Sequence, residues 1–371
     1  MERINELREI LNGFVKCYKP HVECLANILI SMCIVKTVNL VEIAGVMYGK
    51  VKQSSRYRRL QRFFQLVWLD YDLIAKFIIN WLCPKAPWYL AIDRTNWQWG
   101  KKDINILVLA VIYKSAAIPI YWMVLNKQGS TAMRERKALI QRFADVFGKE
   151  NIAGIIADRE FIGKEWFRYL VWKKIPFFIR IKGNALVANR QGKKVRADSL
   201  FRQLKPGEKH RIKETRDVYG RDLYLTGARS PLSGEFMIVA SNRQVDDAVE
   251  TYLKRWQIET LFGCLKGRGF RFEDTHITDR IKIKKMMALL AIAFCWAHKT
   301  GEWRNAEQKA IPLKAHHRLA VSIFRYGLDF LREAILRITR KSSLFKICLR
   351  LFSPLPDLEK PAPTIAFGAV L

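Results

Sequence analysis

Four side chains near residue 260 have the types and spacing to act on a phosphate group. They are Tyr252, Arg255, Glu259 and Lys266. Their offsets of 0, 3, 7 and 14 along the chain place them on one narrow face of a single helix. A carboxylate among two cations and a phenol suits a metal-binding glutamate beside groups that hold phosphates. A solvated helix face with one Arg–Glu pair, worth roughly 0.2–0.5 kcal/mol, fits the same spacing, and spacing alone favours it.

Two aspartates could complete a set of acidic ligands with Glu259. Asp93 lies inside the apolar segment AIDRTNW, and Asp158 ends the apolar segment NIAGIIAD. Open α/β sheets bind ligands at the carboxyl ends of their strands, although either aspartate alone could equally be a cap or part of a structural ion pair. Three oxygen ligands without His or Cys favour two Mg²⁺ ions, with Mn²⁺ as the alternative, for cutting or joining a phosphodiester.

The pattern of apolar residues predicts the elements that position these acids. Strands separated by short turns predict an antiparallel meander at 88–97, 104–114 and 117–125. A helix, a buried strand, a second helix and a fifth strand follow at 131–147, 151–158, 163–174 and 176–182. The sequence therefore predicts an α/β core. If its first and fourth strands are neighbours, Asp93 and Asp158 face each other.

The segments around this core have different patterns. Residues 183–243 hold short strand-like pieces broken by Gly and Pro, which we interpret as a β-rich insertion before the glutamate-bearing helix. Residues 1–85 are predicted to be helical. Residues 275–352 are also predicted to be helical, with a buried core helix around 286–296, and the tail from Pro354 is rich in proline and predicted to be extended.

An arginine-rich helix near residue 60 is a candidate DNA contact. The segment SSRYRRLQRFF interleaves Tyr and Phe with arginines, among them Arg56, Arg59 and Arg62. Two short helices followed by an arginine-rich third fit a small DNA-binding bundle whose last helix meets phosphates or a groove. The alternative is a basic amphipathic helix that only packs on the next domain. The net charge of the chain favours DNA contact.

The composition restricts the partners. The 371 residues include 65 Lys+Arg against 34 Asp+Glu, which gives a net charge of +31 at pH 7. Such an excess indicates a polyanionic partner, and nucleic acid is the first candidate. An anionic membrane surface would need a polybasic amphipathic anchor, whereas here the positive charge is spread over almost every segment.

Cysteine usage and apolar runs indicate the compartment. The seven cysteines form no Cys-x-x-Cys pair, which indicates a reducing environment without a disulfide framework. A zinc site formed by Cys17, His21, Cys24 and Cys33 is conceivable, but ordinary buried thiols are the favoured interpretation. No signal peptide is evident, and the longest apolar run is shorter than the ~20 residues of a membrane span. We therefore expect a cytoplasmic protein.

The motifs resemble those of the DDE transposases of bacterial insertion sequences. Asp93 stands in a D-x-T-N-W-like context, Asp158 in ADREF, and Glu259 in Y-x2-R-x3-E-x6-K. This last pattern is similar to the Tyr, Arg, Glu, Lys signature of the insertion-sequence-four family. The segments GRGFRFEDTHIT at 267–278 and IFRYGLDFL at 323–331 also resemble that family, so the similarity covers most of the chain.

The resemblance implies an RNase H-like mixed-sheet catalytic core with a β-rich insertion, flanked by N-terminal and C-terminal helical regions. The expected parts are a helical DNA-binding domain at 1–85, the first part of the core at 86–182, the insertion at 183–243, the glutamate-bearing part of the core at 244–300, and a C-terminal helical region with a tail at 301–371. The implied activity is cut-and-paste transposition, with cleavage at transposon terminal inverted repeats and strand transfer of the 3′ ends into target DNA.

The same resemblance assigns roles to the site residues. Asp93, Asp158 and Glu259 are the implied catalytic metal ligands. The implied contacts to the DNA backbone near the scissile phosphate are Tyr252, Arg255 and Lys266. Arg159 either touches DNA or pairs with Glu160. A homodimer on double-stranded DNA, associated with the bacterial nucleoid, is expected. The alternatives are an RNase H-like nuclease without strand transfer and a catalytically inactive DNA-binding relative.

One feature departs from the better-known relatives. Those proteins free their transposon ends through a DNA hairpin, and a tryptophan of the insertion stacks on a flipped base. No tryptophan lies between Trp172 and Trp256 in this chain. Tyr224 or Phe236 could stack instead, because base stacking needs only an aromatic face. The use of a hairpin is therefore an open question at the level of the sequence.

Overall fold

Five strands form the centre of the molecule in the order β3-β2-β1-β4-β5. Their bounds are β1 Trp88–Trp99, β2 Lys102–Tyr113, β3 Ala116–Leu125, β4 Ile152–Ala157 and β5 Phe177–Ile181. The first three strands pair antiparallel, and β4 pairs parallel with both β1 and β5. This mixed α/β arrangement confirms the predicted RNase H-like core. The computed structural model describes residues 2–15, 17–83, 85–315, 318–337 and 342–353, so the predicted extended tail from Pro354 lies outside the described residues.

Local chemistry explains why these strands associate closely. Strand β2 is buried without interruption from Ile104 to Val111, which matches its unbroken apolar sequence. In β4, a Cβ atom at Gly154 would lie 2.8 Å from the ring of Phe178 and 3.4 Å from that of Tyr89. Only a residue without a side chain fits there, and Tyr89 and Phe178 pack edge to face across it with ring centroids 6.1 Å apart.

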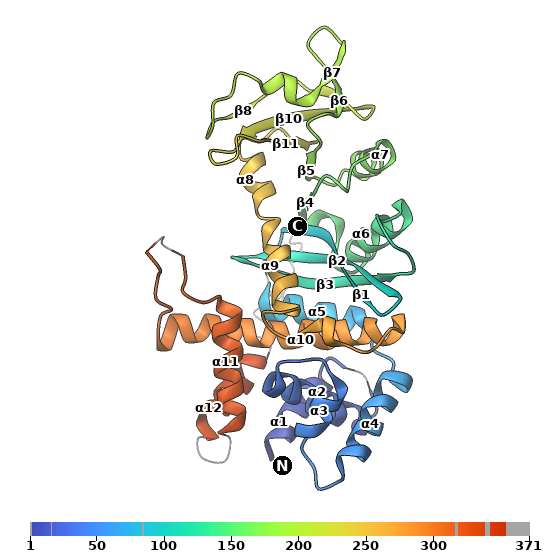
Figure 1. Ribbon diagram of the computed structural model, residues 1–371, viewed down its shortest axis with the longest axis vertical. Coiled ribbons are helices and arrows are strands. Elements are labelled where there is room, and N and C mark those ends of the chain that lie inside the picture. Colours follow the sequence, from blue (N-terminus) through green and yellow to red (C-terminus); the bar gives the residue numbers. More distant parts are fainter. Residues whose placement is uncertain (1, 16, 84, 316–317, 338–341, 354–371) are drawn as a thin grey trace, which may run out of the picture.

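The segment predicted as a β-rich insertion extends the same sheet. Its strands are β6 Leu186–Ala188, β7 Lys194–Arg196, β8 Lys209–Arg211, β9 Arg216–Val218, β10 Arg221–Arg229 and β11 Phe236–Ser241. Strand β11 pairs antiparallel with β5, so core and insertion form one 11-stranded sheet. Figure 1 shows these strands at the top, the core strands in the middle and most helices below.

Helices cover the faces of the core sheet. They include α6 Met133–Phe147, α7 Lys164–Trp172, α8 Ala248–Leu253 and α9 Trp256–Leu265, and the C-terminal helix α10, Arg280–Trp303, also packs on β3. The prediction of one continuous helix through Tyr252 and Lys266 is wrong, because α8 ends before Lys254 and α9 begins after Arg255. Across the junction the backbone N–H groups bond three residues back, as Arg255 does to the Tyr252 carbonyl at 2.9 Å, which tightens the turn.

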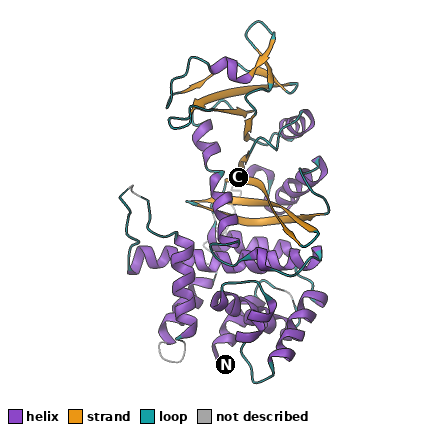
Figure 2. Ribbon diagram, viewed as in Figure 1, coloured by secondary structure: helices purple, strands orange, loops and turns teal. Residues whose placement is uncertain are grey.

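Helices also form both ends of the described chain. The N-terminal helices are α1 Glu2–Asn12, α2 Lys19–Val35, α3 Leu40–Val46, α4 Gln53–Leu66 and α5 Tyr71–Leu82; the C-terminal ones are α10 Arg280–Trp303, α11 Ile323–Leu336 and α12 Ser342–Phe352. Short single turns lie at Lys149–Asn151, Ala197–Phe201, Phe272–Asp274 and Arg304–Gln308. The apolar run at 286–296 is buried in α10, as predicted. Figure 2 shows strands in the upper and middle parts of the molecule with helices beside them, and a lower part made of helices.

In the described part of the chain, no single helix has the length and apolar composition that crossing a membrane requires. The pair formed by Lys19–Val35 and Leu40–Val46 passes such a test only when taken together, and the two helices are bent by 100° relative to each other.

Candidate active site

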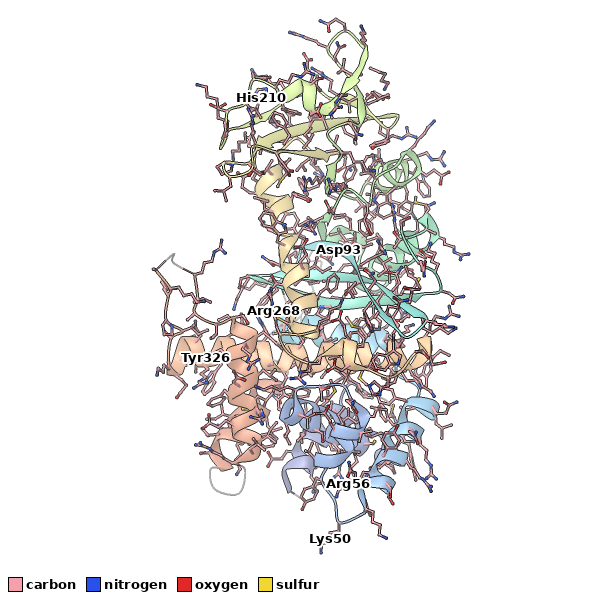
Figure 3. The ribbon with its side chains drawn as sticks, viewed as in Figure 1. Lys50, Arg56, Asp93, His210, Arg268 and Tyr326 are labelled. Carbon is pink, nitrogen blue, oxygen red and sulfur yellow. The ribbon has the colours of Figure 1, made fainter. Side chains whose placement is uncertain are left out.

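Asp93 and Asp158 lie side by side on neighbouring strands. The last paired position of the parallel strands β1 and β4 joins Ile92 to Ala157. Asp93 is the next residue of β1, and Asp158 is the residue that follows β4. Adjacent strands are about 4.8 Å apart, so the two carboxylates emerge next to each other at the carboxyl end of β4. The condition stated from the sequence, that the first and fourth strands are neighbours, is therefore met. Figure 3 shows Asp93 close to the junction of α8 and α9.

The guanidinium group of Arg255 connects the acidic residues. Arg255 Nη1 lies 3.2 Å from Asp93 Oδ2, and its Nη2 lies 2.8 Å from Glu259 Oε1. Arg255 Nε donates to the Tyr252 hydroxyl at 3.3 Å, and that hydroxyl donates to Asp158 Oδ1 at 3.1 Å. The side chain of Arg255 is only 5% exposed. The structure thus gathers all three acids around one buried cation and one phenol.

The three acids offer the type of ligand atom that a hard divalent cation prefers. Asp93, Asp158 and Glu259 offer only carboxylate oxygens, and two of the three residues are adjacent. Within the described ranges, no three His, Cys, Asp or Glu side chains are grouped closely enough to hold a metal ion in this arrangement. Arg255 lies between Asp93 and Glu259 instead. Glu259 is 54% exposed, so its carboxylate has room to change partner.

The ionised form of Asp93 is disfavoured by its surroundings in the folded protein. Burial raises the pKa of Asp93 to about 6, and the nearby carboxylates of Glu160 and Asp158 act in the same direction. The Arg94 backbone N–H and the Arg255 guanidinium oppose this shift without cancelling it. Burial also raises the pKa of the Tyr252 hydroxyl. A divalent cation would therefore be attracted to this pair of aspartates.

Lys266 contacts β1 three residues beyond Asp93. It follows the last residue of α9, and its Nζ donates to the Asn96 carbonyl of β1 at 3.0 Å. The same Nζ lies 2.7 Å from Glu273 Oε1. The predicted stripe on one helix face is broken by the helix junction, but Tyr252, Arg255 and Lys266 each contact β1 or the residue after β4.

A clamp between Arg94 and Glu160, which the sequence analysis missed, holds the backbone beside the two aspartates. Arg94 Nε and Nη2 donate to Glu160 Oε1 and Oε2 at 2.9 and 2.8 Å. Buried Arg136 donates to the Glu160 carbonyl at 3.1 Å. Glu160 thus pairs with Arg94 rather than with Arg159, and Arg159 is exposed. The sequence feature that could have predicted this ion pair is the position of Arg94 one residue after Asp93 and of Glu160 two residues after Asp158.

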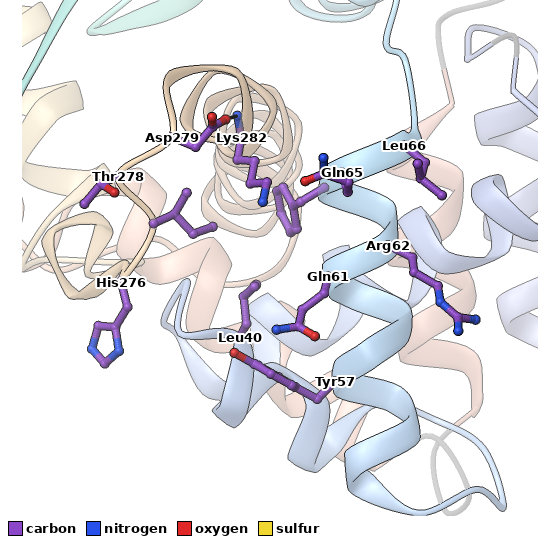
Figure 4. A pocket seen from close by; sticks show the side chains of 12 residues that line it. Leu40, Tyr57, Gln61, Arg62, Gln65, Leu66, His276, Thr278, Asp279 and Lys282 are labelled. Carbon is purple, nitrogen blue, oxygen red and sulfur yellow. Dashed lines mark hydrogen bonds between the residues drawn. The ribbon is translucent and has the colours of Figure 1, made fainter.

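The three N-terminal arginines lie in different surroundings. Arg56 donates to backbone carbonyls around the end of α3, including that of Met47 at 2.7 Å. Arg59 donates to Glu23 Oε1 at 3.1 Å and to the Pro20 carbonyl. Arg62 is exposed on α4 (Figure 4). Contact of these arginines with DNA stays a prediction. The guanidinium groups of Arg56 and Arg59 hydrogen-bond within the protein, whereas that of Arg62 is exposed.

The remaining candidates are distributed as follows. Tyr224 on β10 and Phe236 on β11 are half-buried, and the Arg229 guanidinium lies 5.3 Å from the Phe236 ring centroid. Base stacking by either residue stays a prediction.

Cys24 and Cys33 are buried free thiols, and burial raises the pKa of Cys24 to about 11. Cys17 donates to the Trp68 carbonyl.

Comparison with known proteins adds an independent finding. A family model described as "Transposase DDE domain" matches residues 84–296, a segment that contains the whole sheet and all three acids. Among solved structures, the chain is similar to one described as the cryo-EM structure of piggyBac transposase synaptic complex with hairpin DNA. The sequence identity is 14%, the match covers 97% of this chain and 84% of the other, and the TM-score is 0.47. No match was found among curated proteins.

Proposed function

Because this chain belongs to the transposase DDE domain family, we propose that it cuts DNA at the terminal inverted repeats of a transposon and joins the freed 3′ ends to target DNA. More narrowly, we place it in the insertion-sequence-four group on its Tyr, Arg, Glu, Lys pattern. The observation that carries the proposal is the site geometry. Parallel strands hold Asp93 and Asp158 side by side, and Arg255 links this pair to Glu259.

In this proposal the three acids hold two Mg²⁺ ions, or Mn²⁺ in their place. When bound, the ions would favour formation of the attacking oxygen from water or a 3′ hydroxyl and offset charge on the leaving oxygen. The chain itself orients the ligands. The Tyr252 hydroxyl fixes the Asp158 carboxylate, and the Arg94–Glu160 clamp fixes the backbone beside both aspartates. Tyr252, Arg255 and Lys266 would contact the DNA backbone near the scissile phosphate.

The proposed partner is double-stranded DNA, both as transposon ends and as target. The net charge of +31 favours such a partner, because each neutralised phosphate releases counterions. We further propose that two copies of the chain assemble on DNA. Cut-and-paste transposition must hold two transposon ends together, and one set of acids can act on one end at a time.

The decisive experiment supplies pre-cleaved transposon ends, a target plasmid and Mg²⁺ to the full chain. Joined products are expected from a transposase, whereas hydrolysis without joining would indicate a nuclease. End binding without any reaction would indicate an inactive DNA-binding relative. Inspection of the DNA that flanks the gene for short inverted repeats would supply the end sequence to use.

Substitution of Glu259 by Gln tests the proposed role of the third acid. We expect Glu259→Gln to keep its affinity for transposon ends and to lose cleavage. Glu333→Gln is a matched control, because Glu333 also lies on a helix, is partly exposed and pairs with an arginine four residues away. Unchanged cleavage by Glu259→Gln would remove this residue from the mechanism.

A further inference from the structure

A pocket lies between helix α7, helix α6 and the first residue of β10. We call it the α7 pocket, and it has a volume of about 580 Å³. Sites for small molecules occupy about 300–1,000 Å³, so this volume suits a small ligand. The polar and aromatic residues that line the pocket are Lys137, Glu165, Arg168, Tyr169, Trp172 and Arg221. Figure 1 shows α7 between α6 and the strands of the insertion.

One face of α7 supplies most of this lining. The residues at positions 165, 168, 169 and 172 recur at the spacing of a single helix face. The buried residues on the other side of the helix are Trp166, Phe167 and Leu170. The ring of Tyr219, which precedes β10, packs edge to face on that of Phe167 with centroids 5.7 Å apart. Helix α7 is therefore fixed to both the core and the insertion, with its outer face toward the pocket.

Three cations of the pocket have no acid partner. In the part of the chain that the structure describes, Lys137, Arg168 and Arg221 form no ion pair, although Glu165 lines the same pocket. The Nε of Arg221 is buried and has no hydrogen-bond partner in the protein. A buried donor without a partner is unfavourable unless an acceptor binds there. The pocket therefore has the positive charge and the free donors that hold a phosphate group.

Trp172 gives the pocket an accessible aromatic face. It is the last residue of α7 and is 71% exposed. Tyr169 already has partners, since its ring stacks on that of Trp166 with centroids 5.8 Å apart and Lys137 Nζ lies 5.1 Å from its centroid. An open indole ring beside phosphate-binding cations is the combination that holds a nucleic-acid base together with its phosphate.

The α7 pocket lies away from the candidate active site. Helix α7 runs from the end of β4, where Asp158 lies, back to the start of β5. Its nine residues extend about 13 Å at the usual rise of an α-helix. Trp172 is at the far end of this helix from Asp158, so a ligand stacked on it is not held by the three acids.

We propose that the α7 pocket binds a single nucleotide unit, with its base stacked on Trp172 and its phosphate held by the three unpaired cations. Glu165 is the one acid among the lining residues, and a carboxylate accepts a hydrogen bond from the exocyclic amine of a base. Adenine and cytosine carry such an amine and thymine does not, so the pocket favours dAMP over dTMP. This inference goes beyond the proposed function and does not depend on it.

A free nucleotide and one unit of a single strand present the same chemistry to this pocket. The test is calorimetric titration of the full chain in EDTA, which prevents binding through metal ions at the acids. The probes are dAMP, its two halves deoxyadenosine and inorganic phosphate, dTMP, and a short single strand of deoxyadenylate. We expect dAMP to bind more tightly than either half and several-fold more tightly than dTMP. A strand that binds far more tightly than dAMP identifies the strand as the source, whereas equal affinity per nucleotide identifies the free nucleotide.

Two substitutions with matched controls test whether binding occurs in this pocket. Trp172→Ala is expected to weaken dAMP binding by about 10-fold or more, because base stacking is lost. Its control is Trp68→Ala, since Trp68 is also 71% exposed but lies outside the pocket. Arg168→Ala is expected to weaken dAMP binding by a similar factor. Its control is Arg350→Ala, which removes another exposed helical arginine, on α12.

The outcomes are decided by dAMP. Affinity for dAMP no greater than for phosphate, or an equal loss in Trp172→Ala and Trp68→Ala, would overturn the inference. A chain that binds the single strand but not dAMP, with strand binding unchanged in both pocket variants, would do the same. Failure to cut or join DNA would contradict the proposed function alone. Trp172 and Arg168 are exposed, so both variants are expected to fold, and thermal unfolding verifies this.

Discussion

Asp93 is largely buried, and its side chain receives the Arg94 backbone N–H at 2.8 Å and one Arg255 N–H at 3.2 Å. Its pKa of about 6 lies above the ordinary value of 3.8, with burial as the largest cause. The folded protein therefore binds this proton more tightly than the unfolded chain does. Stability falls as the pH rises from about 4 to about 6, and the full cost remains above pH 6. A carboxylate kept at such a cost is typical of a functional site.

This sign leads to a prediction for Asp93→Asn in the metal-free protein. We expect the substitution to raise the free energy of unfolding at pH 7.5 by about 1–3 kcal/mol, because the pKa of Asp93, about 6 with the Arg255 attraction included, lies about two above its ordinary value, which corresponds to about 3 kcal/mol at most. At pH 4.5 the gain should be clearly smaller. Urea unfolding in EDTA at both pH values measures it, with exposed Asp222→Asn as control. An equal gain at both pH values would contradict this account of Asp93.

Residue types and spacing singled out Asp93, Asp158 and Glu259 as candidate metal ligands, but they could not predict which side chains would pair with these acids. Asp93 and Asp158 were recognisable as charges in apolar strands. Arg94 was not, because its partner Glu160 lies 66 positions away and their pairing depends on the β1–β4 register. Arg255 was expected to face DNA, yet in the folded chain it also bridges Asp93 and Glu259. A linear pattern identifies a cation without identifying its partner.

At the scale of elements, local sequence patterns predicted whether a segment is a helix or a strand better than they predicted which elements pair with each other. The unbroken apolar run of β2 and the apolar β4 were evident as strands. The pairing of β11 with β5 was not, because it joins residues such as Ser241 and Phe178 that are far apart in the sequence. The break between α8 and α9 also escaped prediction, since Lys254 and Arg255 are both good helix formers and the turn is set by tertiary contacts.

Helices α10 and α11 cross at two glycines that allow their backbones to touch. A Cβ atom at Gly301 would lie 2.0 Å from the Ile323 carbonyl oxygen, and one at Gly327 would lie 1.8 Å from that of Ala297. Both contacts are with backbone atoms, so no side chain can move aside to relieve them. The packing of α11 on the buried α10 therefore depends on these two positions.

We expect Gly327→Ala to lower the free energy of unfolding by about 1–3 kcal/mol or more, because the added methyl group must push two helix backbones apart. Gly45→Ala in α3 is the control. The nearest atom to its new Cβ is the end of the Gln53 side chain at 3.5 Å, so it should be neutral or stabilise by up to about 1 kcal/mol. Chemical unfolding of both variants measures the difference. Equal stability of the two variants would show that α10 and α11 do not rely on this close contact.

At the scale of the whole molecule, the two ends of the described chain share one core. Trp81 of α5 donates its indole N–H to the Leu351 carbonyl of α12 at 2.7 Å, and Trp296 of α10 donates to that of Cys348 at 2.8 Å. The ring of Phe352 packs against those of Phe14 and Phe77. The N-terminal helices are thus packed into one core with the C-terminal helices and do not form a tethered module.

If the chain binds DNA as proposed, its affinity should depend on salt concentration, and Lys266 allows one proposed phosphate contact to be tested. A net charge of +31 predicts a steep fall of affinity as salt concentration rises. If Lys266 meets a phosphate, Lys266→Ala should weaken binding and reduce the slope of log K against log salt by about 0.9. Fluorescence anisotropy over a salt series measures this slope. A lower melting temperature with an unchanged slope would instead limit Lys266 to linking the Asn96 carbonyl with Glu273, and the proposed phosphate contact would then be rejected.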